Sequence, residues 1–100
     1  MNMIKIPLSE IKDKKKLKLN DNEILILKVD NNFYAIENKC PHAGCRLSYY
    51  GKILSERKIM CTCHGAIFSL EDGKVIDGPT SKSLKIYKVK IINEELLIEI

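Results

Sequence analysis

The protein has 100 residues, enough for one small domain with a modest hydrophobic core, and we expect residues 1–100 to form that domain. Hydrophobic residues make up 45% and charged residues 30% of the chain, which is typical of a soluble globular protein. The net charge of +4 is moderate, aromatic residues reach only 6%, and no nucleic-acid-binding signature occurs, so we expect no nucleic-acid partner.

The N-terminal sequence MNMIKIPLSE has neither the apolar segment nor the small-residue cleavage site of a signal peptide. The longest strongly apolar run, residues 24–27, is far too short to cross a bilayer. We therefore expect a cytoplasmic protein that makes no membrane contact.

Apolar residues recur mainly at every second position, a pattern that favours β-strands over helices. Residues 3–6 are predicted as a strand that Pro7 stops, and the polar segment 9–16 has room for one helical turn. Residues 24–37 predict a hairpin around a turn at Asn31 and Asn32. Further short strands are predicted at residues 58–61, 66–70, 74–76, 85–92 and 96–100. Many short strands separated by turns predict an all-β fold, a small antiparallel sandwich or barrel.

Lysines are concentrated in one short segment, at positions 12, 14, 15, 16 and 18. Such a run is usually a solvated loop and strand edge. The alternative is a docking patch for an acidic partner, and the sequence leaves both interpretations open.

All four cysteines and both histidines fall in two motifs, CPHAGC at residues 40–45 and CTCHG at residues 61–65. A domain held only by disulfides would leave both histidines without a role, and a cysteine nucleophile would lack a third residue to orient its histidine. In extended loops, C-x-H and C-x2-H spacings let paired side chains converge on a metal. A zinc site with two cysteines and two histidines remains an alternative, although it would leave two cysteines unexplained.

C-x-H followed by C-x2-H resembles the signature of Rieske proteins, in which two cysteines bind one iron of a [2Fe–2S] cluster and two histidines bind the other. Eighteen residues lie between His42 and Cys61, and the resemblance covers nearly the whole chain. It implies the Rieske sandwich with cluster-binding loops at one end and a single [2Fe–2S] cluster. The implied ligands are Cys40, His42, Cys61 and His64.

The resemblance extends to residues around the implied ligands. Gly44 and Gly65 match family glycines and are expected to have positive φ. Gly78 and Pro79 resemble the third loop that covers the cluster. Each of these loops is therefore expected near the metal centre.

Two further features resemble the Rieske proteins of cytochrome bc complexes. Cys45 and Cys63 occupy the positions that form a disulfide between the cluster loops there, so the resemblance implies the same bridge. Ala66 and Phe68 stand where that group has a serine and a tyrosine whose hydroxyls donate hydrogen bonds to sulfur. Because Ala66 and Phe68 have no hydroxyl group, the resemblance implies a lower reduction potential than in that group.

The resemblance implies a soluble, monomeric electron carrier that passes single electrons from a reductase, expected to be a flavoprotein, to an electron-accepting oxidoreductase. An oxygenase would need a second iron site on two histidines and a carboxylate, and the two histidines are already used, so we do not expect an enzyme. The alternative is a small subunit of a larger oxidoreductase of the oxygenase or nitrite-reductase type.

Overall fold

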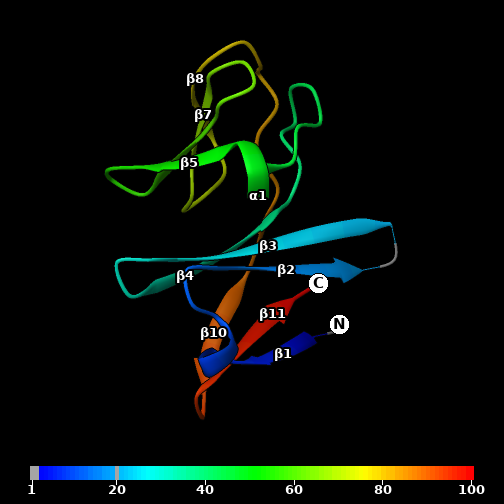
Figure 1. The fold of residues 1–100 in the computed structure, drawn as a ribbon, viewed down its shortest axis with the longest axis vertical. Coiled ribbons are helices and arrows are strands. Elements are labelled where there is room, and N and C mark those ends of the chain that lie inside the picture. Colours follow the sequence, from blue (N-terminus) through cyan, green and yellow to red (C-terminus); the bar gives the residue numbers. More distant parts are fainter. Residues whose placement is uncertain (1–2, 20) are drawn as a thin grey trace.

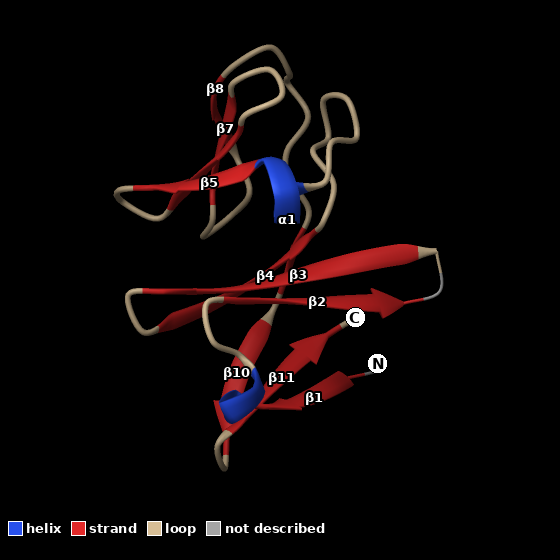
Figure 2. Cartoon of the chain, in the orientation of Figure 1, coloured by secondary structure: helices blue, strands red, loops and turns tan. Residues whose placement is uncertain are grey.

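The computed structural model describes residues 3–19 and 21–100, and within them the chain forms eleven strands, one 3-10 turn and one short helix (Figure 1). All strand pairs are antiparallel, and Figure 2 shows how strands dominate the molecule. The predicted all-β class is confirmed. No helix in the described ranges is long and apolar enough to cross a membrane.

Three sheets are arranged one above another (Figure 1). The central sheet has the order β2 (Lys14–Leu19), β3 (Asn22–Val29), β4 (Asn32–Glu37), β9 (Ile86–Tyr87). The second sheet has the order β1 (Met3–Pro7), β11 (Glu95–Glu99), β10 (Val89–Ile92). The third sheet has the order β5 (Gly51–Leu54), β6 (Lys58–Cys61), β7 (Ala66–Ser69), β8 (Val75–Asp77).

Strand β3 of the central sheet is buried on both faces, which explains its unbroken apolar run. Alternate residues of a strand point to opposite faces. Ile24 and Ile26 therefore join a core with β1 and β11, whereas Leu25 and Leu27 join a core with β6 and β7. The sequence of a strand that is covered on both faces is a continuous hydrophobic run and not an alternation of apolar and polar residues.

The hairpin of β3 and β4 is present, but the predicted position of its turn was wrong by one residue. Asp30 and Asn31 form the turn, with φ of 51° and 65°, while Asn32 already pairs with Val29. Two-residue hairpin loops with both central residues at positive φ match the natural twist of the strands, and Asp and Asn tolerate that conformation well.

Two other predictions need correction. The polar segment 9–16 does contain a turn, the 3-10 segment Leu8–Glu10, but it becomes strand from Lys14 onward. An edge strand can expose alternate lysines while Leu17 and Leu19 supply its partly buried face. The single strand predicted at 85–92 is divided between two sheets, since β9 pairs with β4 whereas β10 pairs with β11.

One helical turn and one strand were not predicted. The helix α1 (Leu47–Tyr50) and strand β5 follow the first cysteine–histidine motif without a break. At Gly51 a side chain would overlap the carbonyl of Leu47, to which the Gly51 N–H donates. Glycine therefore allows the abrupt change from helix to strand.

Candidate metal centre

The two cysteine–histidine motifs lie at one end of the molecule, the upper end in Figure 1, together with the loop that follows β8. The first motif follows β4, and the second connects β6 to β7. Strand pairing of β6 with β7, in register from Lys58 and Ser69 to Cys61 and Ala66, holds both ends of the second motif.

The two motifs share one backbone arrangement. The carbonyl of Cys40 accepts a hydrogen bond of 2.8 Å from the N–H of Gly44, and the carbonyl of Cys61 accepts one of 2.8 Å from Gly65. Gly44 and Gly65 have φ of 78° and 83°, in the region that glycine adopts most readily. The positive φ expected at both glycines is therefore present, and it turns each loop back toward its cysteine.

Cys40 and Cys61 form the buried side of the site. Both thiols are free, and the residues are only 2% and 1% exposed. Burial raises the pKa of the Cys61 thiol, and the neighbouring Cys40 thiol raises it further. Hydrogen bonds from the backbone of Cys63 and His64 act in the opposite direction. A coordinated metal would lower the pKa instead, because it binds the thiolate and outweighs the effect of burial.

His42 and His64 form the outer side of the site. Both residues are exposed, and their ring centroids lie 4.8 Å apart with an interplanar angle of 82°. Two loops that are distant in sequence thus bring their imidazoles together at the surface. A redox partner could approach the site from this side.

The donor set fits a two-iron cluster better than a single zinc ion. In a tetrahedral zinc site, bond lengths near 2.0–2.3 Å place donor atoms roughly 3–4 Å apart. Within residues 3–19 and 21–100, the only group of three or more such donors lying within 4.8 Å of one another is Cys45, Cys61 and Cys63. Two of those sulfurs are joined in a disulfide. Separate thiol and imidazole pairs suit a [2Fe–2S] cluster whose two irons have different ligands.

The predicted disulfide between Cys45 and Cys63 is present, and it links the two motif loops. The two Cα atoms are 6.7 Å apart, and eighteen positions separate the residues in sequence. The N–H of Cys40 also donates to the carbonyl of Cys45 at 2.8 Å. The bridge therefore restrains both loops close to the buried thiols.

The third loop packs on the second motif. Gly78 has φ of 114°, and a Cβ atom at this position would lie 2.5 Å from Cα of Ala66. Only glycine permits such close backbone contact without displacement. Pro79 follows as an exposed residue of the same loop. Ala66 and Phe68 are fully buried in the hydrophobic core that also contains Cys40 and Cys61.

Comparison with known proteins identifies the family. Residues 3–88 match the model of the Rieske [2Fe–2S] domain. The chain belongs to the Rieske family. A Rieske domain holds one [2Fe–2S] cluster, so this protein carries one.

Similar proteins include both carriers and subunits of complexes. The chain is 34% identical over 83 residues to the ferredoxin component of the naphthalene 1,2-dioxygenase/salicylate 5-hydroxylase systems of a Ralstonia species, covering 83% of this chain and 78% of that protein. It is 35% identical over 81 residues to the cytochrome b6-f complex iron-sulfur subunit of Chlorobaculum tepidum, covering 81% of this chain and 42% of that subunit.

The fold is shared with solved structures. The ferredoxin of carbazole 1,9a-dioxygenase from Nocardioides aromaticivorans superposes with a TM-score of 0.83, covering 98% of this chain and 97% of that ferredoxin. Sequence identity is 22%, so this likeness concerns the fold alone.

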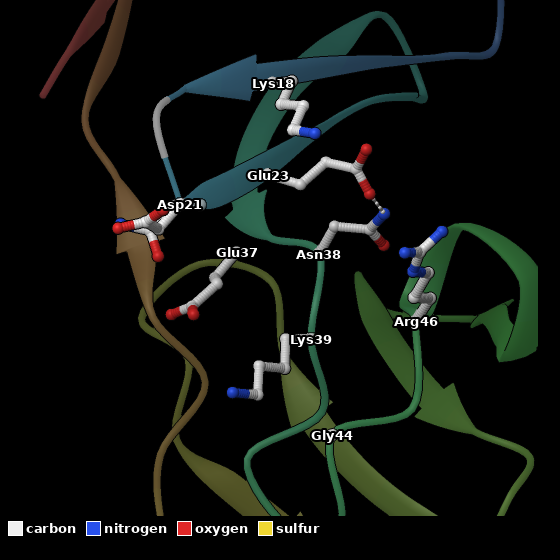
Figure 3. Close-up of a pocket in the computed structure, with 9 residues that line it drawn as sticks. Lys18, Asp21, Glu23, Glu37, Asn38, Lys39, Gly44 and Arg46 are labelled. Atoms are coloured by element: carbon white, nitrogen blue, oxygen red, sulfur yellow. Dashed lines mark hydrogen bonds between the residues drawn. The ribbon is translucent and has the colours of Figure 1, made fainter.

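Asn38 is a site residue that the sequence did not reveal. It is 4% exposed and lies just before the first Rieske motif (Figure 3). Its Nδ2 donates to Oε1 of Glu23 at 2.7 Å and to Oγ of Ser48 at 3.0 Å, while its Oδ1 accepts from the N–H of Ser48 at 2.6 Å. A single asparagine forms no repeating pattern in the sequence. Its burial and its hydrogen bonds in the structure are what identify it as the connection between β3 and α1.

A hollow of about 460 Å³ lies next to Asn38, between the end of the central sheet and the first Rieske loop (Figure 3). Three cations and three carboxylates line it together with Asn22, Asn38 and Gly44: Lys18, Lys39, Arg46, Asp21, Glu23 and Glu37. The formal charges of the lining side chains balance.

Thr62, inside the second motif, makes structural contacts that the sequence did not reveal. Its N–H and its Oγ1 both donate to the carbonyl of Tyr50, at 2.9 Å and 2.8 Å. The second Rieske loop is thereby attached to the end of α1, which itself follows the first loop. One helical turn therefore contacts both loops.

Proposed function

We propose that this Rieske protein carries single electrons between two redox proteins, with Cys40, His42, Cys61 and His64 as the ligands of its cluster. The observation that carries the proposal is the pairing of two buried thiols with two exposed imidazoles on neighbouring loops. When bound, the cluster accepts one electron and returns it without making or breaking a covalent bond in a substrate.

The protein's own groups have separate tasks in this proposal. The buried thiols hold the cluster from the inner side, and the backbone of Cys63 and His64 donates hydrogen bonds to Cys61. Such bonds favour the thiolate over the thiol. The exposed imidazoles of His42 and His64 present the cluster to a partner's cofactor. The disulfide keeps both loops in place while the charge of the site changes.

We infer a carrier and not an enzyme, acting as one domain over residues 1–100. Both hydrophobic cores include residues of the central sheet, which supports a single folding unit. The similarity to ferredoxin components of dioxygenase systems supports the role of an electron carrier. We propose that this carrier is soluble, monomeric and cytoplasmic. Its partners are then a flavoprotein reductase and an electron-accepting oxidoreductase.

The second candidate is a subunit of a larger oxidoreductase. Similarity to a cytochrome b6-f iron-sulfur subunit favours it, as does the paired disulfide cysteine pattern. A free carrier is expected to purify alone, whereas a subunit is expected to co-purify with its complex from the native cells.

Reduction by a flavoprotein reductase tests the proposal. The aerobically purified protein is mixed anaerobically with an NADH-dependent flavoprotein ferredoxin reductase, and cytochrome c serves as the final acceptor. We expect reversible bleaching of the visible cluster absorption and sustained cytochrome c reduction that Cys40→Ala abolishes. Visible absorption that neither the reductase nor dithionite changes would contradict electron carriage.

A further inference from the structure

We propose that the groove between β2 and α1 is the docking surface for an acidic segment of a redox partner protein. The proposal rests on the proposed function, because it assigns the partner of the same cluster. The groove, called the lysine groove below, has a volume of about 330 Å³ and is lined by Lys14, Lys15, Lys16, Ser48 and Tyr49. It contains three cations and no carboxylate.

The alternation of β2 directs its lysines toward the metal end of the molecule. Lys14 and Lys16 pair across the sheet with Leu27 and Leu25, and directly paired residues point to the same face. Leu25 and Leu27 pack in the core that contains Cys40 and Cys61. The two lysines therefore stand on the face of the central sheet that carries the cluster-binding loops.

The charges of Lys14 and Lys16 are not neutralised within the described part of the chain. Among those residues neither lysine has an ion-pair partner. Lys14 Nζ donates to the backbone carbonyl of Ser48 at 2.7 Å, which fixes its position without cancelling its charge. Lys15 differs, because its Nζ lies 3.9 Å from a carboxylate oxygen of Glu10.

Tyr49 adds an aromatic group to the rim of the groove. The residue is 80% exposed, and its ring contacts Tyr50 edge to face at 4.8 Å between centroids. Tyrosines are enriched at protein interfaces, where they supply a large contact area and a hydroxyl at low entropic cost. A basic groove with such a rim is suited to an acidic loop that carries apolar residues.

The groove is continuous with the redox site through α1. The segment Leu47–Tyr50 begins two residues after Cys45, and its end accepts both hydrogen bonds from Thr62 in the second loop. A partner seated in the lysine groove therefore contacts the helical turn from which both Rieske loops are held. Its remaining surface can extend over the two exposed histidines.

Charge complementarity selects an acidic protein as the occupant. A cationic patch next to a redox centre increases the encounter rate with an anionic partner and orients it, and salt screens this effect. The chain shows no nucleic-acid-binding signature. A redox partner has to approach the loops that α1 connects to the groove.

The test compares two variants of equal net charge. Lys14→Glu/Lys16→Glu alters the groove, and Lys88→Glu/Lys90→Glu alters exposed positions at and before β10, in the sheet on the opposite side of the central sheet. The electron donor is an acidic plant-type [2Fe–2S] ferredoxin, which has a lower potential than a Rieske centre. Stopped-flow absorbance measures the second-order rate at low and high salt.

We expect the wild-type rate to fall as salt increases. The groove variant is expected to lose at least about tenfold at low salt and most of its salt dependence, since steering contributes on the order of ten- to a thousandfold. The control variant is expected to stay within about twofold of wild type. Equal losses in both variants, or none in either, would overturn the proposal.

Two further variants guard against misfolding. Lys16→Glu alone leaves the bond from Lys14 to Ser48 intact and is expected to give a partial loss. Tyr49→Ser is expected to slow the reaction several-fold at all salt concentrations. Every variant must keep the visible cluster absorption. A wild-type protein without that absorption would defeat the proposed function, whereas an intact cluster with groove-independent rates defeats the docking surface.

A membrane is the competing occupant of a basic groove. Co-sedimentation with vesicles of phosphatidylcholine and phosphatidylserine distinguishes it. We expect no binding that depends on the groove. Vesicle binding that Lys14→Glu/Lys16→Glu abolishes, together with unchanged electron-transfer rates, would overturn the proposal in favour of a lipid surface.

Discussion

The base of the molecule and its cluster-binding tip are stabilised by different means. The base, formed by the central sheet and the β1, β10 and β11 sheet, has strands of up to eight residues and a core of aliphatic side chains with Ala35 and Tyr87. The tip, formed by β5–β8 and the Rieske loops, has strands of three or four residues. In addition to a hydrophobic core around Phe68, it has a disulfide, a metal cluster and specific hydrogen bonds.

The difference separates two requirements of an electron carrier. We expect the long paired strands to form a platform that keeps its shape without the cofactor. The tip must keep two imidazoles at the surface and two thiols buried in its core, so its loops rely on the cluster and the disulfide in addition to apolar packing. We infer that the tip loosens before the base when the cluster or the disulfide is removed.

Replacement of a residue that ligates the cluster is expected to have the largest effect, and to affect the tip but not the base. Cys40→Ala is expected to abolish cluster binding completely, because one iron loses a thiolate, while the base keeps its strands. Iron and sulfide analysis and far-UV circular dichroism measure the two effects. Cluster content of two irons and two sulfides in this variant would exclude Cys40 as a ligand.

Truncation within each core shows whether the parts unfold separately. Phe68→Ala in the tip is expected to cost about 3–5 kcal/mol, and Ile98→Ala in the base about 2–5 kcal/mol. Urea unfolding is followed by visible absorption for the tip and by circular dichroism for the base. We expect Phe68→Ala to separate the two transitions and Ile98→Ala to shift both. Coincident transitions in both variants would mean that the parts unfold as one unit.

Loss of the disulfide is expected to loosen the tip without removing a ligand. Cys45→Ala/Cys63→Ala removes a disulfide that closes a loop of eighteen positions. On entropic grounds such a bridge adds about 3 kcal/mol to the free energy of unfolding. Cluster release in the presence of a chelator is expected to accelerate while the freshly purified variant still contains two irons. An unchanged release rate would show that the bridge does not restrain the loops.

Asn38 connects the base to the tip, and its removal tests that connection. Asn38→Ala leaves the Ser48 N–H and the Glu23 carboxylate without their partner, at a cost of about 1–3 kcal/mol. Asn38→Asp keeps the acceptor for Ser48 but places a second carboxylate next to Glu23. Stability from urea unfolding is expected to recover when Glu23→Gln is added to Asn38→Asp. If stability did not recover, the contact of Asn38 with Glu23 would not be the one that stabilises the protein.

Hydroxyl groups near the cluster are expected to give the smallest effects. Ala66→Ser and Phe68→Tyr each add a donor in the core that contains the buried thiols. If each donor favours the reduced state by about 1 kcal/mol, the potential rises by about 40 mV. Ile67→Ser, at the intervening position of β7, is the control and is expected to leave the potential unchanged. A rise of the potential in Ile67→Ser alone would mean that the side chain at position 67 faces the cluster and that those at positions 66 and 68 do not.

The metal motif was predictable because metal chemistry requires particular residue types at short spacings. Both motifs are therefore visible in the sequence. The strands were predictable from the alternation of apolar residues, and the disulfide pair was implied by the resemblance to Rieske proteins of cytochrome bc complexes. The helix α1 was not, since it is a single turn without a side-chain cap and is held by Lys14 and Thr62 from distant segments. Asn38 was missed for the same reason, because its value lies in contacts between segments and not in a repeating pattern.

A potentiometric titration monitored by electron paramagnetic resonance tests the central claim most directly. We expect one reducible centre per chain that takes up a single electron, with a midpoint potential between roughly −150 and +300 mV, the range of clusters with two histidine ligands. A midpoint of about −400 mV, the value of plant-type clusters with four cysteines, or no reducible centre at all, would contradict the account.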